Sequence, residues 1–222
     1  MLTVPVSFRP AAPGDAPFVT PLVYSTSHRD FDYLFADLAA GQSVLDVLER
    51  FYRLPGGMFS WHNTELALVD SQPVGLVTAY AVSSGDGSSA WLVRAVRTLG
   101  MRGLLRLAWR GLPASRTVQP LLPGSWYIAF VGVLAGRRSL GIGTRLIERS
   151  MMRARAVGCF CAELDVEHDN SLAQALYKRL GFQLVSERGT PQTSPLVATW
   201  RMRRNLEQGG TGRTGPPSAD NM

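Results

Sequence analysis

The sequence predicts a single domain of mixed α and β structure, and three observations lead to this prediction. Short apolar runs typical of strands alternate with segments in which apolar residues recur every three or four positions, as on one face of a helix. Residues 126–157 place a strand, a glycine-containing turn and a helix in direct succession. The chain has 222 residues, of which 45% are hydrophobic and 18% charged, enough for one domain with a full core.

The first quarter of the chain predicts a strand followed by helices. Residues 4–9 alternate between apolar and polar side chains, which indicates a strand. Residues 13–23 begin with a Pro-Gly-Asp sequence and continue with spaced apolar residues, which favours a short helix. Residues 31–38 and 44–52 each carry apolar residues at helical spacing, with Gly41 between the two segments.

The next segment predicts a hairpin and then a helical insertion. Residues 64–69 and 74–82 indicate two strands, because the Asp-Ser-Gln-Pro sequence between them is typical of a turn. Residues 83–89 indicate a flexible linker. One or two amphipathic helices are then expected at residues 91–112, broken near one of their glycines, Gly100 or Gly103.

The insertion, about residues 85–122, is strongly basic. Between Gly85 and Pro120 it holds six arginines and one acid, a net charge of +5. Such a segment suits a membrane surface, an acidic partner or a lid over an acceptor site. A simpler interpretation is that its apolar side chains pack on the domain or on a second subunit while the arginines face water. The residues that would pack in this way are Trp91, Val96, Leu99, Leu104, Leu105 and Trp109.

Charge and cysteine content exclude some classes of protein. The net charge of +6 lies almost wholly in the insertion, so a general nucleic-acid interface is not expected. Cys159 and Cys161, the two cysteines, share a strand face but point in parallel, a poor geometry for a disulfide. We expect buried thiols in a reducing compartment and no metal site. Because neither a leader nor a membrane-spanning run is evident, we expect a cytoplasmic protein.

The last third of the chain predicts alternating helices and strands. Residues 142–157 and 170–180 indicate helices, and residues 159–166 a strand between them. Strands at 182–188 and 196–203 would complete the sheet. We expect the domain to cover residues 1–204. Residues 205–222 are rich in Gly, Pro, Thr and Ser, and we expect them to form a disordered tail.

A glycine-containing turn leads directly into the helix expected from residue 142. The turn reads Arg138-Ser-Leu-Gly141-Ile-Gly143-Thr144 and follows the apolar run 127–133. The first N–H groups of a helix have no intrahelical partner and carry a partial positive charge, so a slim turn lets a phosphate approach them closely. The turn therefore predicts an anion site, although a tight connection without a ligand produces the same pattern.

A second motif follows on the helix expected at residues 170–180. It consists of Asn170, Ala173, Tyr177 and the pair Gly181-Phe182. Together, the two motifs resemble those of the GNAT superfamily of acyl-CoA-dependent N-acetyltransferases. That family joins an Arg/Gln-x-x-Gly-x-Gly/Ala pyrophosphate loop to a downstream Asn-x-x-Ala-x-x-x-Tyr-x-x-x-Gly-Phe helix.

The resemblance implies a fold and a coenzyme site. The fold is a central mixed, mostly antiparallel sheet with a splayed pair of parallel strands and helices on both faces. The resemblance places the pyrophosphate at the turn and the pantetheine arm along residues 130–133, where a backbone N–H would bind the oxyanion and Gly132 would mark a bulge. The implied acetyl-CoA contacts are Val131, Gly132, Val133, Arg138, Ser139, Leu140, Gly141, Ile142, Gly143, Thr144, Asn170, Ala173 and Tyr177.

The resemblance also implies catalytic roles. Tyr177 matches the family's catalytic tyrosine and would protonate the departing thiolate, or it would only pack and hydrogen-bond the sulfur. Asp165 lies at the position of the glutamate used by ribosomal-protein alanine acetyltransferases, but with a shorter side chain. The expected order of candidates for the general base is Asp165, then Glu167, then His168. Asn170 either binds pantetheine or caps its helix.

We therefore expect an N-acetyltransferase that moves an acetyl group directly from acetyl-CoA to an unidentified amine of a small molecule or a protein. We expect the acceptor pocket at residues 31–62 and the insertion, with Asp30, Asp32 and Glu65 as candidate acids, and a homodimer is possible. The alternative is a catalytically silent acyl-CoA sensor or partner-binding module that acts through the basic insertion. A further alternative is the transfer of a longer acyl chain, sheltered by the insertion.

Overall fold

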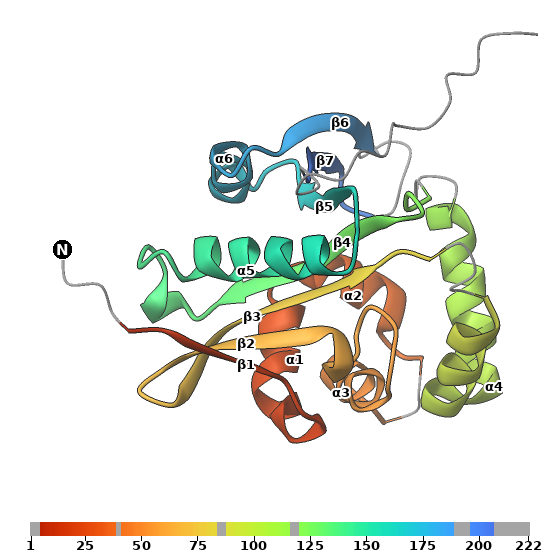
Figure 1. Ribbon diagram of the computed structural model, residues 1–222. Coiled ribbons are helices and arrows are strands. Elements are labelled where there is room, and N and C mark those ends of the chain that lie inside the picture. The colour runs from red at the N-terminus through yellow and green to blue at the C-terminus, as the bar shows by residue number, and fades with distance from the viewer. Residues whose placement is uncertain (1–4, 39–40, 84–87, 116–119, 189–195, 207–222) are drawn as a thin grey trace, which may run out of the picture.

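The computed structural model describes residues 5–38, 41–83, 88–115, 120–188 and 196–206, and these form one sheet covered by helices on both faces (Figure 1). The strand order is β1-β2-β3-β4-β5-β7-β6. β4 and β5 pair in parallel, and every other neighbouring pair is antiparallel. The strands are β1 Ser7–Pro10, β2 Thr64–Val69, β3 Gln72–Ala81, β4 Ser125–Val133, β5 Cys161–Glu167, β6 Gln183–Arg188 and β7 Thr199–Asn205.

The helices follow the predicted order along the chain. α1 to α4 precede the central strand, and α5 and α6 alternate with the strands that follow it (Figure 1). Three short 3-10 turns, at 13–15, 61–63 and 135–137, complete the described elements. The helices are α1 Ala16–Tyr24, α2 His28–Phe35, α3 Val44–Arg53, α4 Ser88–Ser115, α5 Ile142–Ala156 and α6 Ser171–Arg179.

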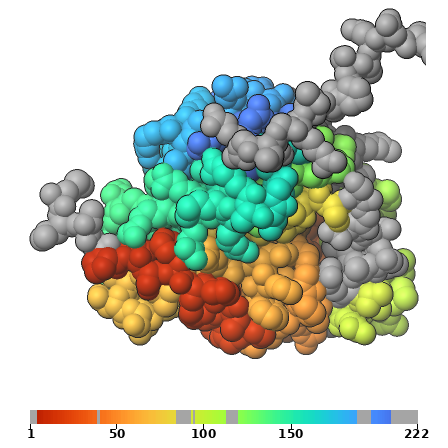
Figure 2. All heavy atoms as spheres, in the orientation of Figure 1, coloured from red at the N-terminus to blue at the C-terminus, as the bar shows by residue number. Residues whose placement is uncertain are grey.

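Each face of the sheet has its own hydrophobic core. Because successive side chains of a strand point to opposite faces, Ala67 and Val77 join the core beneath α5 and α6, whereas Leu66 and Leu76 join the core beneath α1, α2 and α3. Figure 2 shows the α5 face as a closely packed surface, with α5 between the C-terminal strands and the N-terminal half. The sheet thus separates two sets of side chains, one on each of its faces.

The predicted mixed α and β fold, with its mostly antiparallel sheet and one parallel pair, is confirmed. The main differences lie at element ends. β5 begins at Cys161 rather than residue 159, because Gly158 takes a left-handed φ of 78° and Cys159 N–H closes the end of α5 on Ala154. β7 runs to Asn205 and Leu206 is buried, so the sheet continues past residue 204. The tail predicted from 205 onward otherwise lies outside the described residues.

The insertion forms α4, which is kinked at one of the two predicted positions. Gly100 has a φ of 67° and a ψ of 176°, a conformation outside the helical range. Gly103 remains helical, but a Cβ there would lie 2.7 Å from the carbonyl oxygen of Leu38, so only glycine allows this close approach. The linker predicted at 83–89 falls largely outside the described residues.

Of the apolar residues of the insertion that were expected to pack on the domain or on a second subunit, two do not pack on the domain. Leu99 is buried, and Leu104 packs partly against the core, but Leu105 and Trp109 are 63% and 76% exposed. α4 is seated on the domain through Gly103 and its neighbours on that side of the helix, and positions 105 and 109 lie on the other side.

Candidate active site

The parallel pair opens into a fork. β4 and β5 are paired from Ser125 opposite Cys161 to Ile128 opposite Leu164, and beyond that point both strands continue without pairing to each other. An opening between two parallel strands leaves backbone N–H and C=O groups that can accept an extended ligand as an additional strand. The splayed pair that the sequence predicted is therefore confirmed.

A β-bulge lies at the mouth of the fork, but not at Gly132 as expected. Thr78 of β3 pairs with Phe130, and the next residue, Ala79, pairs with Ile128, so Ala129 is the extra residue. The bulge inverts the alternation of β4: Ile128 faces the core beneath α5, and Phe130 faces the core beneath α1 to α3. Gly132 does not form the bulge; its lack of a side chain instead allows close packing against a helix.

Gly132 lies against α1. A Cβ on this residue would sit 2.7 Å from Cγ of Leu22, closer than two carbon atoms approach in proteins. Backbone hydrogen bonding agrees with this placement. Leu134 N–H donates to Val74 O at 2.9 Å, and the alternation of an antiparallel ladder then directs the backbone of Gly132 toward β3 as well.

The same alternation directs the backbone of Val131 and Val133 into the fork. Arg138 supports this assignment, since its Nε donates to Val133 O at 3.3 Å from the turn that follows β4. Of the three predicted strand contacts, Val131 and Val133 therefore present their N–H and C=O groups to the fork, and Gly132 does not.

The turn between β4 and α5 has the form expected of an anion cradle. Ser139 and Gly141 both have left-handed φ angles, 63° and 74°, and residues 138–141 are exposed. Gly141 is the N-cap of α5, and its carbonyl accepts the first helical hydrogen bond from Arg145. Within the described residues, no backbone carbonyl accepts from the N–H groups of residues 139–144.

These observations fit an anionic ligand. The unpaired donors stand at the N-terminus of a 15-residue helix, where the partial positive charge is largest. A Cβ on Gly143 would lie 3.7 Å from Leu176 of α6 and 3.9 Å from Val133 of β4. The turn, the open end of β4 and helix α6 are therefore close neighbours in space.

Helix α6 begins with the expected Asn cap and presents the expected tyrosine. Asn170 Oδ1 accepts a hydrogen bond from Ala173 N–H at 3.1 Å, so its capping role is observed directly. Tyr177 is buried against Phe182, and its hydroxyl has no hydrogen-bond partner among the described residues. Burial raises the pKa of the Tyr177 hydroxyl to about 12. The phenol therefore keeps its proton at neutral pH.

A model of the acetyltransferase (GNAT) family matches residues 33–182, more than half of the chain. This chain belongs to the GNAT acetyltransferase family. The comparison with curated proteins found no match. Family membership supports an acyltransferase and implies that the protein binds an acyl-CoA.

Solved structures agree with the GNAT fold. An N-acetyltransferase from Staphylococcus aureus Mu50 is 18% identical, with a TM-score of 0.61 over 89% of this chain and 100% of that one. The ribosomal-protein-S18-alanine N-acetyltransferase from Escherichia coli is 13% identical, with a TM-score of 0.54 over 95% and 100%. The PaiA N-acetyltransferase from Thermoplasma acidophilum, solved with coenzyme A, is 10% identical, with a TM-score of 0.50 over 90% and 99%.

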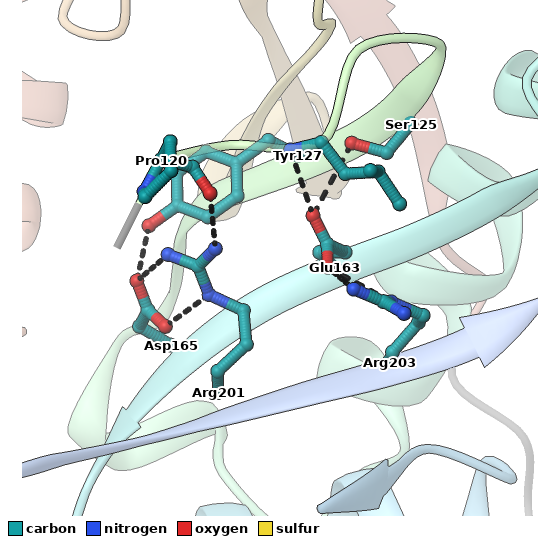
Figure 3. Close-up of polar contacts among 8 residues, drawn as sticks. Pro120, Ser125, Tyr127, Glu163, Asp165, Arg201 and Arg203 are labelled. Carbon is teal, nitrogen blue, oxygen red and sulfur yellow. Dashed lines mark hydrogen bonds and ion pairs between the residues drawn. The ribbon is translucent and has the colours of Figure 1, made fainter. Parts of the chain in front are cut away.

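In this GNAT chain, the first candidate for the base is held in an ion pair (Figure 3). Asp165 Oδ1 accepts from Arg201 Nε at 2.7 Å, and Oδ2 accepts from Arg201 Nη2 at 2.9 Å. The Tyr127 hydroxyl also donates to Oδ2, at 2.9 Å. Burial raises the pKa of Asp165 above its ordinary value, and the Arg201 charge opposes that rise.

A second ion pair of the same kind lies two residues earlier on β5. Glu163, which is 1% exposed, accepts from Arg203 Nε at 2.9 Å and from the Ser125 hydroxyl at 3.4 Å (Figure 3). Glu163 stands directly opposite Arg203, and Asp165 opposite Arg201, so both pairs join β5 to β7 across the sheet. Their geometry is that of structural cross-strand pairs.

The second candidate for the base lies further along the same strand face. Glu167 Oε1 accepts from the Ser27 hydroxyl at 2.9 Å, and Ser27 also lies 3.2 Å from Asp30 Oδ2. Within the described chain, Ser27 is the one hydrogen-bond partner of the Glu167 carboxylate. Burial raises the pKa of Asp30, whose other oxygen accepts from Val197 N–H. The GNAT fold thus brings two carboxylates to the N-terminus of α2.

The remaining candidate acids and bases lie elsewhere. Glu65 is buried on the α5 face, where Arg149 Nε donates to it at 2.6 Å, so it stands on the opposite side of the sheet from α2. Asp32 accepts from the Tyr24 hydroxyl at the surface. His168 is exposed beside Trp200, with ring centroids 5.3 Å apart. None of these three residues, Glu65, Asp32 and His168, forms a hydrogen bond with Glu167 or Asp30 in the described part of the chain.

The aromatic side chains of residues 31–62, where the acceptor pocket was expected, are largely core. Phe31 and Phe35 are each 5% exposed, and Phe59 stacks on Phe130 with centroids 5.6 Å apart. Both cysteines are free and buried, as predicted. The described residues hold no cluster of three or more His, Cys, Asp or Glu side chains arranged for a metal ion.

Sequence reasoning did not identify Tyr127, Arg201 or Ser27 as parts of the site. Arg201 lies in a run of alternating polar and apolar residues, a pattern that predicts only a strand. Its position opposite Asp165 depends on the register between β5 and β7. Ser27 lies 140 positions from Glu167 in the chain. The signal available for Ser27 was its position just before a helix, which indicates a cap and nothing about a carboxylate on β5.

Proposed function

We propose that the protein is an N-acetyltransferase that transfers an acetyl group from acetyl-CoA directly to a primary amine. One arrangement supports this best: a buried tyrosine and a partly exposed carboxylate lie on opposite faces of the sheet that contains the fork. Tyr177 belongs to the core beneath α5 and α6, whereas Glu167 contacts Ser27 at the start of α2. A thioester held in the fork would have its leaving sulfur toward one and its attacking amine toward the other.

The proposed residues for the donor follow from the fork and the turn. The unpaired N–H groups of residues 139–144 suit the pyrophosphate, and the Val131 and Val133 backbone suits the pantetheine amides. The Val131 N–H is the proposed donor to the oxyanion of the tetrahedral intermediate, because it faces the fork next to the bulge.

The proposed reaction is a direct displacement. An ammonium loses one proton, its nitrogen bonds to the carbonyl carbon, and the carbon–sulfur bond breaks. The nitrogen then loses a second proton and the sulfur gains one, so one proton is released overall. Tyr177, with a pKa of about 12, lies about 3.5 units above an ordinary thiol near 8.5. Its contribution is therefore a hydrogen bond to the departing sulfur, and solvent completes the proton transfer.

Glu167 is the proposed base, ahead of Asp165. Both Asp165 oxygens are engaged by Arg201, and Tyr127 donates to one of them, so proton uptake there would disturb a buried ion pair. Glu167 is partly exposed and keeps acceptor capacity beyond its Ser27 hydrogen bond. It can take up a proton directly or through water.

The proposed acceptor carries a cationic amine. Glu167 and Asp30 place negative charge beside the fork, which favours an ammonium group. Two solved structures of similar fold are named for acceptors with such groups: the S18-alanine enzyme, and an agmatine N-acetyltransferase with 16% identity and a TM-score of 0.54 over 90% of this chain and 99% of that one.

The test has two stages. Isothermal titration of the full chain with acetyl-CoA and with longer acyl-CoA species measures donor binding and preference. Thiol release is then followed over a panel of diamines, agmatine and peptides with free N-termini. We expect acetyl-CoA to bind and at least one amine to accelerate thiol release. Failure to bind any acyl-CoA would refute the assignment, and binding without turnover on any amine would favour the catalytically silent alternative.

A further inference from the structure

The outer face of α4 carries a row of exposed apolar side chains. Met101, Leu105, Trp109 and Leu112 are 61%, 63%, 76% and 63% exposed. Their spacing of four, four and three residues places them on one face of the helix beyond the kink at Gly100. A tryptophan normally buries most of its ring, so this degree of exposure calls for an explanation.

A strip of arginines borders the apolar row. Arg102, Arg106 and Arg110 each follow a member of the row by one position, and so lie beside it on the helix. Arg106 donates to Asp37 O at 2.8 Å and Arg110 donates to Ala36 O, which anchors α4 to the end of α2. Arg102 is exposed and makes no ion pair or hydrogen bond within the described chain. The strip is positive throughout, because α4 contains no acidic residue.

A cationic hollow adjoins one end of the row. At the kink, a hollow of about 500 Å³ is lined by Met101 and three arginines, Arg50, Arg97 and Arg102. None of its lining residues belongs to the fork or the turn. The hydroxyl of Thr98, another lining residue, is buried and has no hydrogen-bond partner in the described part of the chain. Apolar side chains and anion-binding groups thus lie next to each other along one helix.

We propose that α4 is an interfacial helix that binds the surface of an anionic lipid bilayer. A helix with aromatic and aliphatic side chains on one face and arginines beside them lies in the plane of the headgroups. The row would enter the boundary between headgroups and acyl chains, with Trp109 at the depth that tryptophan favours. Arg97 and Arg102 would contact lipid phosphates. The protein would bind peripherally, since no described helix is long and apolar enough to cross a bilayer.

Shape and charge favour a lipid surface over a second copy. A symmetric contact between two copies would bring two arginine strips together without an acid in either helix, which costs binding energy. α4 stands at the margin of the molecule, at the lower right edge in Figures 1 and 2, and the exposed row lies on the convex surface of this helix. A convex row can enter a deformable lipid surface, whereas a protein partner would need a matching groove.

The test is vesicle flotation of the full chain. Vesicles of phosphatidylcholine alone are compared with vesicles in which about one third of the lipid is phosphatidylglycerol. We expect binding to the anionic vesicles, weakened in about 1 M salt, where the Debye length falls to about 3 Å. Replacing both Leu105 and Trp109 by Ser should weaken binding by at least about tenfold. The double change Arg97→Gln and Arg102→Gln should abolish the preference for anionic lipid.

Two controls keep the result specific. Met152→Ser removes an exposed apolar side chain from α5 and should leave vesicle binding unchanged. The thermal midpoint of each variant should match that of the unaltered protein. The proposal is overturned if the unaltered protein does not bind anionic vesicles, or if the Leu105 and Trp109 variant binds them equally well. It is also overturned if sedimentation without lipid shows a dimer that this variant loses, because the face would then contact a second copy.

Discussion

Arg201 engages both carboxylate oxygens of Asp165, at 2.7 and 2.9 Å, across the antiparallel pair β5–β7. The Arg201 side chain is 4% exposed and that of Asp165 18% exposed, so the pair is largely withdrawn from water. A carboxylate held in this way joins two strands and is poorly placed to accept a proton from a substrate. Predictions on stability and on catalysis follow from this pair.

Breaking the pair should destabilise the protein. Arg201→Met leaves Asp165 buried without its counter-charge, and we expect the free energy of unfolding to fall by about 3–5 kcal/mol. Urea unfolding followed by circular dichroism measures the change. Arg29→Met is the control, because Arg29 pairs with Asp169 at the surface, where such pairs contribute about 0–1 kcal/mol. Equal effects of the two substitutions would contradict a structural role for Arg201.

Activity should depend on Glu167 more than on Asp165. Glu167→Gln keeps the size of the side chain but removes the base, and we expect kcat/KM to fall by about 10²- to 10⁴-fold. Asp165→Asn should lower kcat/KM by less than about tenfold, measured where both variants are folded. The reverse order would restore Asp165 as the base.

Tyr177→Phe should lower kcat with little effect on coenzyme affinity. Because burial raises the pKa of the Tyr177 hydroxyl to about 12, the group keeps its proton between about pH 6 and 10. The ratio of the kcat values of the unaltered protein and the variant should therefore stay constant over that range. An alkaline fall in the unaltered protein that disappears in Tyr177→Phe would show a lower pKa and contradict this prediction.

The same pKa predicts a loss of stability in strong base. The unfolded tyrosine ionises near pH 10, whereas the folded residue resists ionisation up to about pH 12. The contribution of Tyr177 to stability is complete below pH 10 and is lost as the pH rises toward 12. Urea midpoints for Tyr177→Phe should therefore fall less steeply over this interval than those of the unaltered protein.

Replacing Gly132 with alanine should destabilise the protein unless the Leu22 side chain of α1 moves away. Gly132→Ala places a Cβ 2.7 Å from Leu22 Cγ, and we expect a loss of about 1–3 kcal/mol in the free energy of unfolding. In a Leu22→Ala background the clash is removed, so the same substitution should have a smaller effect. A double-mutant cycle by urea unfolding measures the coupling, and simple additivity would show that the two residues do not oppose each other.

The turn should bind coenzyme less well when Gly141 gains a side chain. Its φ of 74° costs a non-glycine residue about 1–2 kcal/mol, and relief of that strain would move the N–H groups of the turn. We expect Gly141→Ala to raise the Kd for coenzyme A by about tenfold, measured by isothermal titration. Gly136→Ala is the matched control, since a Cβ there meets no atom within 4 Å. Equal Kd values for the two variants would argue against anion binding at the turn.

Local patterns were sufficient to predict the parts of the site that lie close together in the chain. The strand, the turn at Gly141 and helix α5 follow one another directly, and Asn170 caps the helix that carries Tyr177. The bulge at Ala129 could not be predicted, because it depends on the register of β4 against β3. The row on α4 was missed for a similar reason: amphipathic spacing does not say which face meets the domain.

The sequence by itself determined the family, the order of its elements and the place of the turn, because these depend on short-range propensity and motif spacing. Tertiary structure alone decided which polar side chains contact each other. Asp165 lies opposite Arg201 because of the register between β5 and β7, and Glu167 contacts Ser27, which lies 140 positions away in the chain. Such contacts are set by how the strands pair and how the helices pack on the sheet, and no local pattern in the chain encodes them.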